Sequence, residues 1–196
     1  MAEIKPTSPT PSPDAAKKSF AAPGSMQRRK RSGAASEYKK SLQEKQTLKR
    51  LYGLTEKQFK RYVKETLGKM GKVDDVSAEL IRRLERRLDN VVFRLGFAKS
   101  RPHARQLVSH SYFLVNGKSV NIASYEVKKE DIVALKETKK KKPLFKELSE
   151  QLKKYQTPTW LLLDKSKLEG KTTGEPTLQE VAPPAEISQI FEFYSR

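Results

Sequence analysis

The chain has 196 residues, of which 41 are Lys or Arg and 23 are Asp or Glu, and its formal net charge is +18. The sequence holds no Cys, which excludes a disulfide framework, a thiolate zinc site and a cysteine nucleophile. Its apolar runs are far shorter than the roughly 20 residues that cross a bilayer, and no secretory signal is recognisable. We therefore expect a cytoplasmic protein whose surplus of cations binds a polyanion, either nucleic acid or an anionic membrane surface.

The charge is divided unevenly along the chain. Residues 1–27 are rich in Pro, Ser, Thr and Ala and too poor in apolar side chains to bury a core, so we predict a disordered tail. Cations then predominate in residues 28–66, 82–137 and 138–154, whereas residues 155–196 are weakly acidic. The positive field is therefore expected in the middle of the chain.

Capping signals predict two helices in the first basic region. Ser36 is a suitable N-cap for a helix that Gly53 ends in a left-handed conformation. Thr55 and Gln58 fit the capping-box pattern at the start of a second helix, and Gly68 ends it.

A third helix is predicted to be long and amphipathic, with Ser77 as its cap and Gly96 at its end. Apolar residues recur along it at three- and four-residue steps and predict a single apolar stripe, formed by Leu80, Ile81, Leu84, Leu88, Val91, Val92 and Leu95. A further helix is expected to start at Ser100, with Pro102 tolerated in its first turn.

Strand signals follow Ser111. Asn116-Gly117 lies between the runs Tyr112–Val115 and Lys118–Val120, and Asn-Gly suits the two positive φ values of a type I′ hairpin turn. Further elements are predicted as a strand at Ile132–Leu135, a helix from Pro143 to about Tyr155, a short strand at Leu161–Leu163 and an amphipathic segment at Ile187–Tyr194. The predicted fold class is α+β, with a mostly helical N-terminal domain and an inserted helix-helix-β-hairpin module.

No catalytic constellation is recognisable in the sequence. Neither His103 nor His110 has another metal ligand nearby in sequence, and an organised metal site needs three or four. Gly117-Lys118-Ser119 resembles the end of a phosphate-binding loop, but Tyr112 occupies the position of the first glycine, so the hairpin explains the triplet better. We therefore predict no enzymatic activity, no cofactor and no metal.

Arginines recur at helical spacing opposite the predicted apolar stripe, at Arg82, Arg83, Arg86, Arg87 and Arg94. One interpretation is a solvated face with local ion pairs. We favour phosphate binding, because arginines outnumber the acids on this face and a guanidinium holds phosphate in two-point contacts. The next helix extends the basic surface with Lys99, Arg101, Arg105 and His110.

Two basic runs outside these helices have two interpretations each. The cluster Arg28–Arg31 and the run Lys139–Lys142 are either nuclear signals or flexible phosphate clamps. Tyr112 and Phe113 adjoin the basic surface, and strand alternation predicts that one ring points inward and the other outward, where a base could stack on it.

The stretch from Arg82 to Glu137 resembles the S4 RNA-binding module, a helix-helix-hairpin fold of ribosomal proteins, pseudouridine synthases and tyrosyl-tRNA synthetases. The residues that carry the resemblance are Leu84–Ala98, Ser100-Arg101, Ala104–Val108, His110, Val115–Gly117 and Ser124-Tyr125. The flanks are similar to the bacterial-type small-subunit ribosomal protein S4 family at Ser36–Tyr38, Leu42–Gln46, Leu51–Gly53, Pro158–Leu161 and Glu192–Arg196.

This resemblance, over about residues 28–196, implies a primary rRNA-binding protein that nucleates assembly of the 5′ domain of the small subunit. It also implies contact with small-subunit ribosomal protein five and a position near the mRNA entry path, where the family influences decoding accuracy. Many relatives bind zinc through an N-terminal cysteine-bearing segment, and that site is not expected here because the chain lacks Cys. The alternative is an RNA-modifying enzyme or a ribosome-rescue factor that uses the same module.

The residues expected to bind RNA come from the resemblance and from the charge pattern. The resemblance implies a basic first helix with Lys39, Lys40, Lys45, Lys49 and Arg50, and a module with Arg86, Arg87, Arg94, Ser100, Arg101, Arg105, Gln106, His110, Asn116 and Lys118. The charge pattern adds Arg28, Arg29, Arg31, Arg83 and Lys99. The expected domains are a tail at 1–27, a helical basic part at 28–81, the S4-type module at 82–145 and a C-terminal segment at 146–196 that packs back on the helical part.

Overall fold

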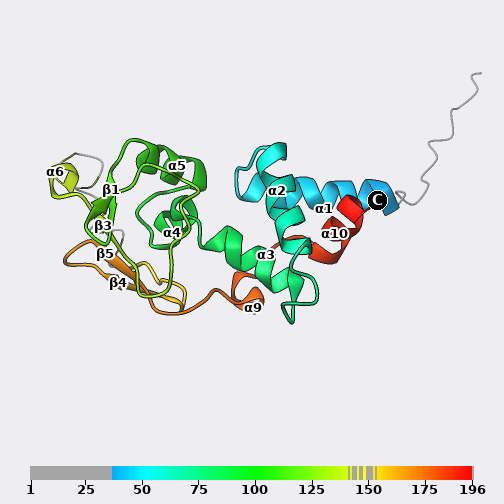
Figure 1. Cartoon of the computed structure of the whole chain (residues 1–196). Coiled ribbons are helices and arrows are strands. Elements are labelled where there is room, and N and C mark those ends of the chain that lie inside the picture. Colours follow the sequence, from blue (N-terminus) through cyan, green and yellow to red (C-terminus); the bar gives the residue numbers. More distant parts are fainter. Residues whose placement is uncertain are drawn as a thin grey trace, which may run out of the picture. The chain divides into compact units, whose positions relative to one another are not determined.

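The computed structural model of the chain describes residues 37–140, 142, 145, 148, 152 and 154–195 (Figure 1). The predicted tail, the cluster Arg28–Arg31 and most of the helix expected from Pro143 lie outside the described residues. The architecture is α+β, as predicted, with helices followed by a small antiparallel sheet. Among the described residues, no helix is long and apolar enough to cross a membrane.

The first two helices form where they are predicted, although Ser36, the predicted cap of the first, lies outside the described residues. Helix α1 (Glu37–Leu51) is followed by Gly53 at a φ of +59°, and α2 (Glu56–Leu67) begins with the predicted capping box between Thr55 and Gln58. With α3 (Val76–Glu85), α9 (Leu178–Val181) and α10 (Ile187–Ser195) they enclose the first of two hydrophobic cores, called the helical core. Its buried residues are Leu48, Tyr52, Leu54, Phe59, Tyr62, Val63, Leu80, Ile81, Leu84, Ile187 and Ile190.

The long helix predicted from Ser77 to Gly96 is instead two helices, α3 (Val76–Glu85) and α4 (Leu88–Arg94). The break occurs because backbone groups at its centre bond to a distant segment. The Leu88 amide donates to the Tyr125 carbonyl at 2.8 Å, and the Val127 amide donates to the Arg86 carbonyl at 2.8 Å. The predicted cap also differs, since the Asp75 side chain, not Ser77, accepts the first amide hydrogen bond.

The break divides the predicted apolar stripe between two cores. Its first three residues, Leu80, Ile81 and Leu84, belong to the helical core. The four residues after the break pack in a second core, called the module core, with α5 (Arg101–Ser109) and the sheet. One amphipathic pattern in the sequence therefore serves two separately packed units.

The predicted hairpin is confirmed. Strands β1 (Phe113–Val115) and β2 (Lys118–Ser119) pair across a turn in which Asn116 has a φ of +48° and Gly117 a φ of +77°. These two positive values are those of a type I′ turn, whose twist matches the flanking strands. Phe113 points into the module core, whereas Tyr112 is half-buried at its edge.

The sheet contains more of the C-terminal segment than the sequence indicated. Its strand order is β2-β1-β3-β5-β4 and every pairing is antiparallel, with β3 at Ile132–Leu135, β4 at Leu161–Asp164 and β5 at Glu169–Thr172. Strand β5 was not predicted. Residues 161–172, expected to pack back on the helical part, thus complete the sheet of the module instead.

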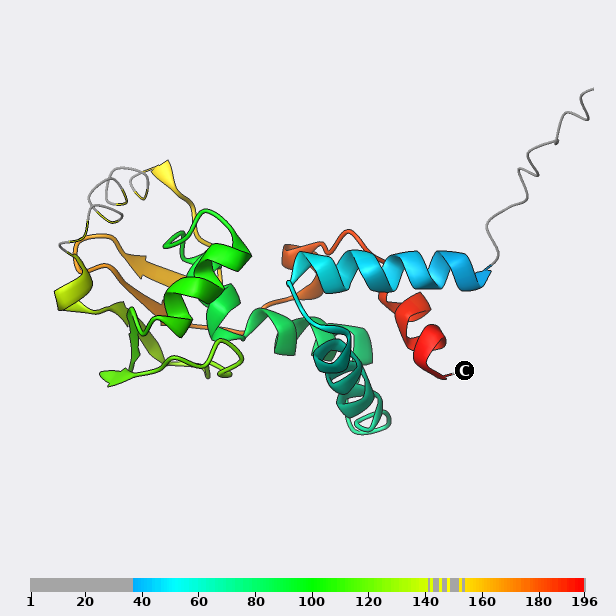
Figure 2. The ribbon, with the colours of Figure 1, turned by 90° about the horizontal axis from the view of Figure 1, so that it is seen from above.

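Only the end of the chain returns to the helical core. After the short helix α9 (Leu178–Val181), helix α10 (Ile187–Ser195) packs along α1, where the amphipathic C-terminal segment was predicted (Figure 2). Ile187 and Ile190 are buried there. A further short helix, α6 (Glu137–Lys140), covers part of the predicted lysine run.

Candidate nucleic-acid interface

The residues predicted to bind RNA differ widely in exposure. On the surface lie Lys39, Lys40, Arg50, Lys99, Ser100, Gln106, His110, Asn116 and Lys118. Half-buried positions are held by Lys49, Arg83, Arg86, Arg94, Arg101 and Arg105, whereas Lys45 and Arg87 are buried. Arg28, Arg29 and Arg31 lie outside the described residues. The basic pattern in the sequence therefore combines a surface with a set of internal contacts.

Exposed residues predicted to bind RNA lie at the start of α5 and along its outer side. Ser100 is the N-cap, and its hydroxyl accepts from the His103 amide at 3.3 Å. Lys99 precedes the cap, Gln106 and His110 lie on the exposed side of the helix, and Lys99 has no ion-pair partner among the described residues. A helix N-terminus favours phosphate because its backbone amides and its dipole both face the anion. This end of α5 is therefore suited to phosphate binding.

Arg101 lies just inside that surface, between two aromatic rings. Its guanidinium carbon is 5.0 Å from the centroid of the Tyr52 ring and 4.6 Å from that of Phe93. Its Nε donates to the Asn90 amide oxygen at 2.7 Å. Burial lowers the pKa of Arg101, and the neighbouring carboxylate of Glu85 opposes this. The side chain is held rigidly, which reduces the entropy lost when a ligand binds.

Arg105 joins α5 to the turn between α1 and α2. Its Nε and Nη2 donate to Asp89 at 3.1 and 2.9 Å, and its Nη1 donates to the Gly53 carbonyl. The predicted RNA-binding guanidinium is therefore already bonded within the protein. Its charge is balanced in part by the carboxylate of Asp89.

The carboxylate of Glu85 is fully buried and accepts four hydrogen bonds. Arg94 donates through Nε and Nη2, both at 2.9 Å, Asn90 donates at 2.6 Å, and Tyr52 donates its hydroxyl at 2.6 Å. Burial alone would lower the pKa of Arg94, but the hydrogen bonds and charge of Glu85 outweigh it and raise that pKa. Arg94 thus connects α4 to the end of α3 in the interior.

Arg87 has a similar internal position. Its side chain forms a two-point contact with Asp89, at 3.1 and 2.8 Å, and donates to the Tyr62 hydroxyl at 2.8 Å. Only 2% of the residue is exposed. Glu85 and Asp89 are the residues in the sequence that indicate this internal role. Acidic side chains that are buried beside an apolar stripe need cations as partners, so neighbouring arginines are expected to bond within the protein.

The basic residues of α1 are paired to different degrees. The Lys45 Nζ lies 2.7 Å from Glu56 and 4.5 Å from the centroid of the Phe193 ring, and Lys49 contacts the other oxygen of Glu56 at 3.0 Å. Lys40 is 3.8 Å from Glu186, and Arg50 is exposed at the end of the helix. The lysines on the interior side of α1 therefore bind Glu56 of α2, and Lys45 also contacts Phe193 of α10.

The hairpin tip presents one exposed cation. The Asn116 side chain is bonded within the protein, since its oxygen accepts from the Ile132 amide at 2.9 Å and its nitrogen donates to Asp131 at 2.8 Å. Lys118 is exposed and has no ion-pair partner among the described residues. Nearby, Tyr112 lies beneath two lysines, with the Nζ of Lys139 and of Lys142 about 5 Å from its ring centroid.

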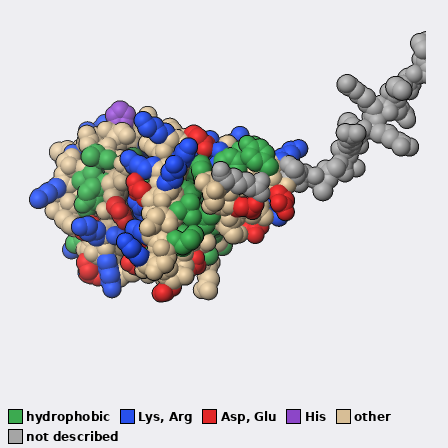
Figure 3. Space-filling model, turned by 45° about the vertical axis from the view of Figure 1, so that its right-hand side comes forward, with side chains coloured by type: hydrophobic (Ala, Val, Ile, Leu, Met, Phe, Trp, Pro, Cys, Tyr) green, Lys and Arg blue, Asp and Glu red, His purple; other side chains and the backbone are tan. Residues whose placement is uncertain are grey.

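The surface shows the consequence of these contacts. On the face drawn in Figure 3, Lys and Arg side chains are interspersed with acidic and apolar ones. Among residues 37–140 and the other described positions, no group of three or more His, Cys, Asp or Glu side chains is placed to hold a metal ion. The exposed cations predicted to bind RNA lie at separate places, with Lys39 and Lys40 on α1, Lys99 before α5 and Lys118 at the hairpin tip.

Known proteins resemble this chain over most of its length. Residues 86–133 match the family model of the S4 domain, and residues 6–91 match that of the ribosomal protein S4/S9 N-terminal domain. The small ribosomal subunit protein uS4 of Persephonella marina is 49% identical over 161 residues, which cover 82% of this chain and 77% of that protein. The uS4 proteins of Caldicellulosiruptor saccharolyticus and Thermotoga petrophila are 48% and 43% identical, over 82% and 89% of this chain. The chain belongs to the uS4 family.

Membership of the uS4 family confirms the resemblance expected from the module and its flanks. The S4 domain match contains the predicted module residues from Arg86 to Lys118, together with the break before α4. The N-terminal match begins at residue 6, earlier than the residue 28 from which the resemblance was expected. The two matches overlap at residues 86–91, which follow the end of α3 and include the start of α4.

Proposed function

We propose that this chain is a structural constituent of the small ribosomal subunit that binds rRNA and has no catalytic role. The observation that carries the proposal is the 49% identity to a small-subunit protein over 82% of the chain, a span long enough to include both the helical core and the module. The S4 domain and the ribosomal-protein N-terminal domain occur side by side in one chain, which favours a ribosomal role over a separate catalytic domain joined to an RNA-binding module.

Binding would proceed through phosphate contacts rather than base recognition. Lys99, Lys118 and the N-terminus of α5 offer charge and backbone donors, while the half-buried Arg101 and Arg105 fix the position of α5 against the helical core. Side chains cannot read the deep groove of A-form RNA, so specificity would come from the shape of the rRNA. Rigid anchoring favours this mode because it keeps the phosphate contacts in a fixed arrangement.

We further propose the finer role that the family resemblance implies. The chain would act as a primary binder that nucleates assembly of the 5′ domain by holding several rRNA helices at a junction. It would contact small-subunit ribosomal protein five and lie near the mRNA entry path in cytoplasmic ribosomes, where it would contribute to decoding accuracy. The RNA-modifying or ribosome-rescue alternative is an outcome of the test below.

The test is crosslinking of the tagged full chain to RNA in cells, followed by sequencing and separation of ribosomal fractions on a gradient. We expect crosslinks at one junction in the 5′ domain of small-subunit rRNA and protein in mature small subunits. Crosslinks mainly to tRNA or to the large subunit, with no protein in mature small subunits, would instead support a modifying or rescue factor.

Binding measurements with purified protein and rRNA test the exposed cations Lys99 and Lys118 directly. Lys99→Gln with Lys118→Gln removes two exposed charges that have no internal ion pair, so folding should be unaffected. Each lost phosphate contact should reduce the slope of log affinity against log salt by about 0.7–0.9. A double variant with unchanged affinity and slope would contradict phosphate binding at the start of α5 and at the hairpin tip.

A further inference from the structure

The hairpin tip contains an asparagine that is chemically labile. The sequence has three asparagines, and Asn90 and Asn121 precede β-branched residues, whereas Asn116 precedes Gly117. Asparagine deamidates when the backbone nitrogen of the next residue attacks its side-chain amide carbon. A β-branched neighbour hinders this attack, but glycine, which has no Cβ, does not. Asn116 is therefore the asparagine at which the sequence favours deamidation.

The reaction needs only water and runs in two steps. The Gly117 nitrogen gives its proton to solvent and bonds to Cγ of Asn116, and the side-chain nitrogen leaves as ammonia, which gives a five-membered succinimide ring. Water then opens the ring at one of its two carbonyl carbons and leaves either aspartate or isoaspartate. A carboxylate, ionised at neutral pH, thus replaces a neutral amide, and the hairpin tip gains one negative charge.

The structure leaves the attacking nitrogen accessible. Gly117 is exposed and has a φ of +77°, and no atom beyond its chain neighbours lies within 4 Å of the position that a Cβ would take. Among the described residues, no hydrogen bond occupies its backbone amide. Protection from deamidation must therefore come from Asn116 itself.

The Asn116 side chain is held at both ends. Its Oδ1 accepts from the Ile132 amide at 2.9 Å, and its Nδ2 donates to the Asp131 carboxylate at 2.8 Å. The other carboxylate oxygen of Asp131 accepts from the Lys128 amide at 2.7 Å, which fixes the position of Asp131. We call the two side-chain contacts of Asn116, with Asp131 and with Ile132, the clasp.

Ring closure is incompatible with the clasp and with the turn. The ring joins Cγ of Asn116 to the Gly117 nitrogen, so the side-chain amide has to leave its two partners. The ring also holds Asn116 at a ψ far from that of a type I′ turn. The folded hairpin, in which Asn116 has a φ of +48°, should therefore deamidate more slowly than the unfolded chain.

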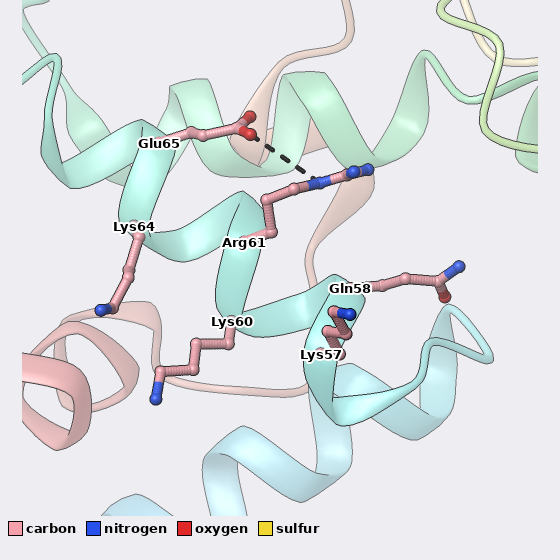
Figure 4. Close-up of a pocket in the computed structure, with 6 residues that line it drawn as sticks. All are labelled: Lys57, Gln58, Lys60, Arg61, Lys64 and Glu65. Carbon is pink, nitrogen blue, oxygen red and sulfur yellow. Dashed lines mark ion pairs between the residues drawn. The ribbon is translucent and has the colours of Figure 1, made fainter.

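An exposed amide on helix α2 provides a contrast. Gln58 borders a hollow of about 530 Å³, whose other lining residues are Lys57, Lys60, Arg61, Lys64 and Glu65 (Figure 4). Its deamidation would need the backbone nitrogen of Phe59, and that amide already donates to the Thr55 carbonyl at 3.0 Å. The ring would also have six members, because glutamine has one more methylene group. Gln58 is therefore an unreactive reference in the same molecule.

Deamidation would open the clasp and change the charge at the tip. An aspartate at position 116 would set its carboxylate against that of Asp131, which now accepts from the amide nitrogen at 2.8 Å. Two carboxylates so close repel each other. Isoaspartate would lengthen the backbone of a two-residue loop, and loop length fixes the register of a hairpin. Either product lowers the positive potential around the exposed Lys118.

We propose that Asn116 is a site of spontaneous deamidation, that the clasp protects it while the hairpin is folded, and that the deamidated hairpin loses its contact with RNA phosphate. The third part rests on the proposed function, whereas the first two depend only on the hairpin itself. Chains that stay unfolded would deamidate at Asn116 and lose RNA affinity, while folded chains would retain it.

The first experiment measures deamidation of the full chain. Wild type is incubated at neutral pH in buffer and in guanidinium chloride, and mass spectrometry of its peptides follows the succinimide and acid forms of Asn116, with Gln58 as the internal reference. We expect Asn116 to react faster in the unfolded chain than in the folded one, while Gln58 stays unchanged. Equal rates in the two states, or an unreactive Asn116 in the unfolded chain, would overturn the proposal.

A pair of variants tests the clasp. Asp131→Ala removes the acceptor of the Asn116 amide nitrogen, and the control Asp164→Ala removes a carboxylate that accepts from Ser166 and Lys167 in its own turn. Loss of one hydrogen bond should make deamidation about 2- to 10-fold faster in folded Asp131→Ala, whereas folded Asp164→Ala should match wild type.

The unfolded state provides the baseline for these variants. In guanidinium chloride the three chains should react alike, because the clasp is absent from all of them, and far-ultraviolet circular dichroism verifies that both variants are folded in buffer. If folded Asp131→Ala deamidates no faster than wild type, the role of the clasp is overturned.

Binding to small-subunit rRNA tests the consequence. Asn116→Asp reproduces the aspartate product, and Asn121→Asp adds the same charge at an exposed position after β2. If Lys118 loses its phosphate, the slope of log affinity against log salt should fall by about 0.7–0.9 in Asn116→Asp and by less in Asn121→Asp. Equal slopes in the two variants would overturn the third part of the proposal.

The outcomes separate this proposal from the proposed function. If the wild-type chain shows no preference for small-subunit rRNA, the proposed function fails and the RNA consequence fails with it, but the deamidation rates still decide the first two parts. If wild type binds that rRNA and Asn116→Asp binds it equally well, only the RNA consequence is overturned.

Discussion

The Tyr52 hydroxyl donates a 2.6 Å hydrogen bond to the buried carboxylate of Glu85, and this bond joins the two cores. Tyr52 belongs to the helical core, whereas the same carboxylate holds Arg94 of α4, whose neighbours pack in the module core. Burial raises the pKa of Tyr52 far above its usual value, and the charge of Glu85 raises it further. The phenol therefore stays protonated and keeps its role as a donor.

Replacing Glu85 should destabilise the whole protein. In Glu85→Gln the amide carries no charge and offers one acceptor oxygen, so Arg94 loses its buried counterion. Removing one partner of a buried ion pair costs about 3–5 kcal/mol. Urea unfolding measures the change, with Glu126→Gln as control, because Glu126 is half-exposed and 3.7 Å from Arg86. That control should cost no more than about 1 kcal/mol. Equal losses in the two variants would show that the Glu85 cluster is not a structural anchor.

Local signals were sufficient to predict several elements. The capping box of Thr55, the Ser100 N-cap and the Asn116-Gly117 turn each depend on residues only a few positions apart, and each is present in the structure. Apolar periodicity also located β3 and α10. These features are fixed by short-range hydrogen bonds and by the backbone preferences of individual residues, so their sequence patterns are reliable guides.

Features set by distant contacts could not be predicted in the same way. The break at Arg87 depends on backbone hydrogen bonds to residues 125–127. No pattern in the neighbouring sequence indicates these bonds. Strand β5 has the polar sequence Glu169–Thr172 and forms because it pairs on both sides, with β3 and β4. Whether a basic side chain faces solvent or a neighbouring carboxylate also depends on the tertiary structure. The sequence therefore predicted RNA binding for both Arg87, which is buried, and Lys99, which is exposed.

Stability should depend on pH through Glu56. Burial alone would raise the pKa of Glu56, but hydrogen bonds from Lys45, Tyr194 and Lys49 lower it from 4.5 to about 2. Because the folded-state pKa is the lower one, the stabilisation is complete above about pH 4.5 and is lost as the pH falls toward 2. The difference in urea midpoint between wild type and Glu56→Gln should therefore shrink between pH 6 and pH 3. A difference that is constant over this range would exclude the charge of Glu56 as its cause.

Gly170 should not tolerate a side chain. A Cβ at this position of β5 would collide with the methyl groups of Leu95 in the module core. Overpacking of this kind typically costs about 1–3 kcal/mol, so we expect that loss for Gly170→Ala in urea unfolding. Gly174→Ala is the control, because its Cβ would lie 3.6 Å from the Trp160 Cβ, an ordinary contact. A neutral Gly170→Ala would imply that Leu95 can move aside without cost.

Arg87 and Lys99 should separate stability from RNA binding. Arg87→Gln breaks a buried contact with Asp89, so we expect a loss of about 3–5 kcal/mol in unfolding free energy. Once folded, this variant should retain the salt dependence of rRNA binding, because a side chain that is 2% exposed has no access to phosphate. Lys99→Gln should show the reverse, with unchanged stability and a slope reduced by about 0.7–0.9. Measuring both quantities on both variants decides the matter, and a reduced slope in folded Arg87→Gln would place that arginine at the RNA after all.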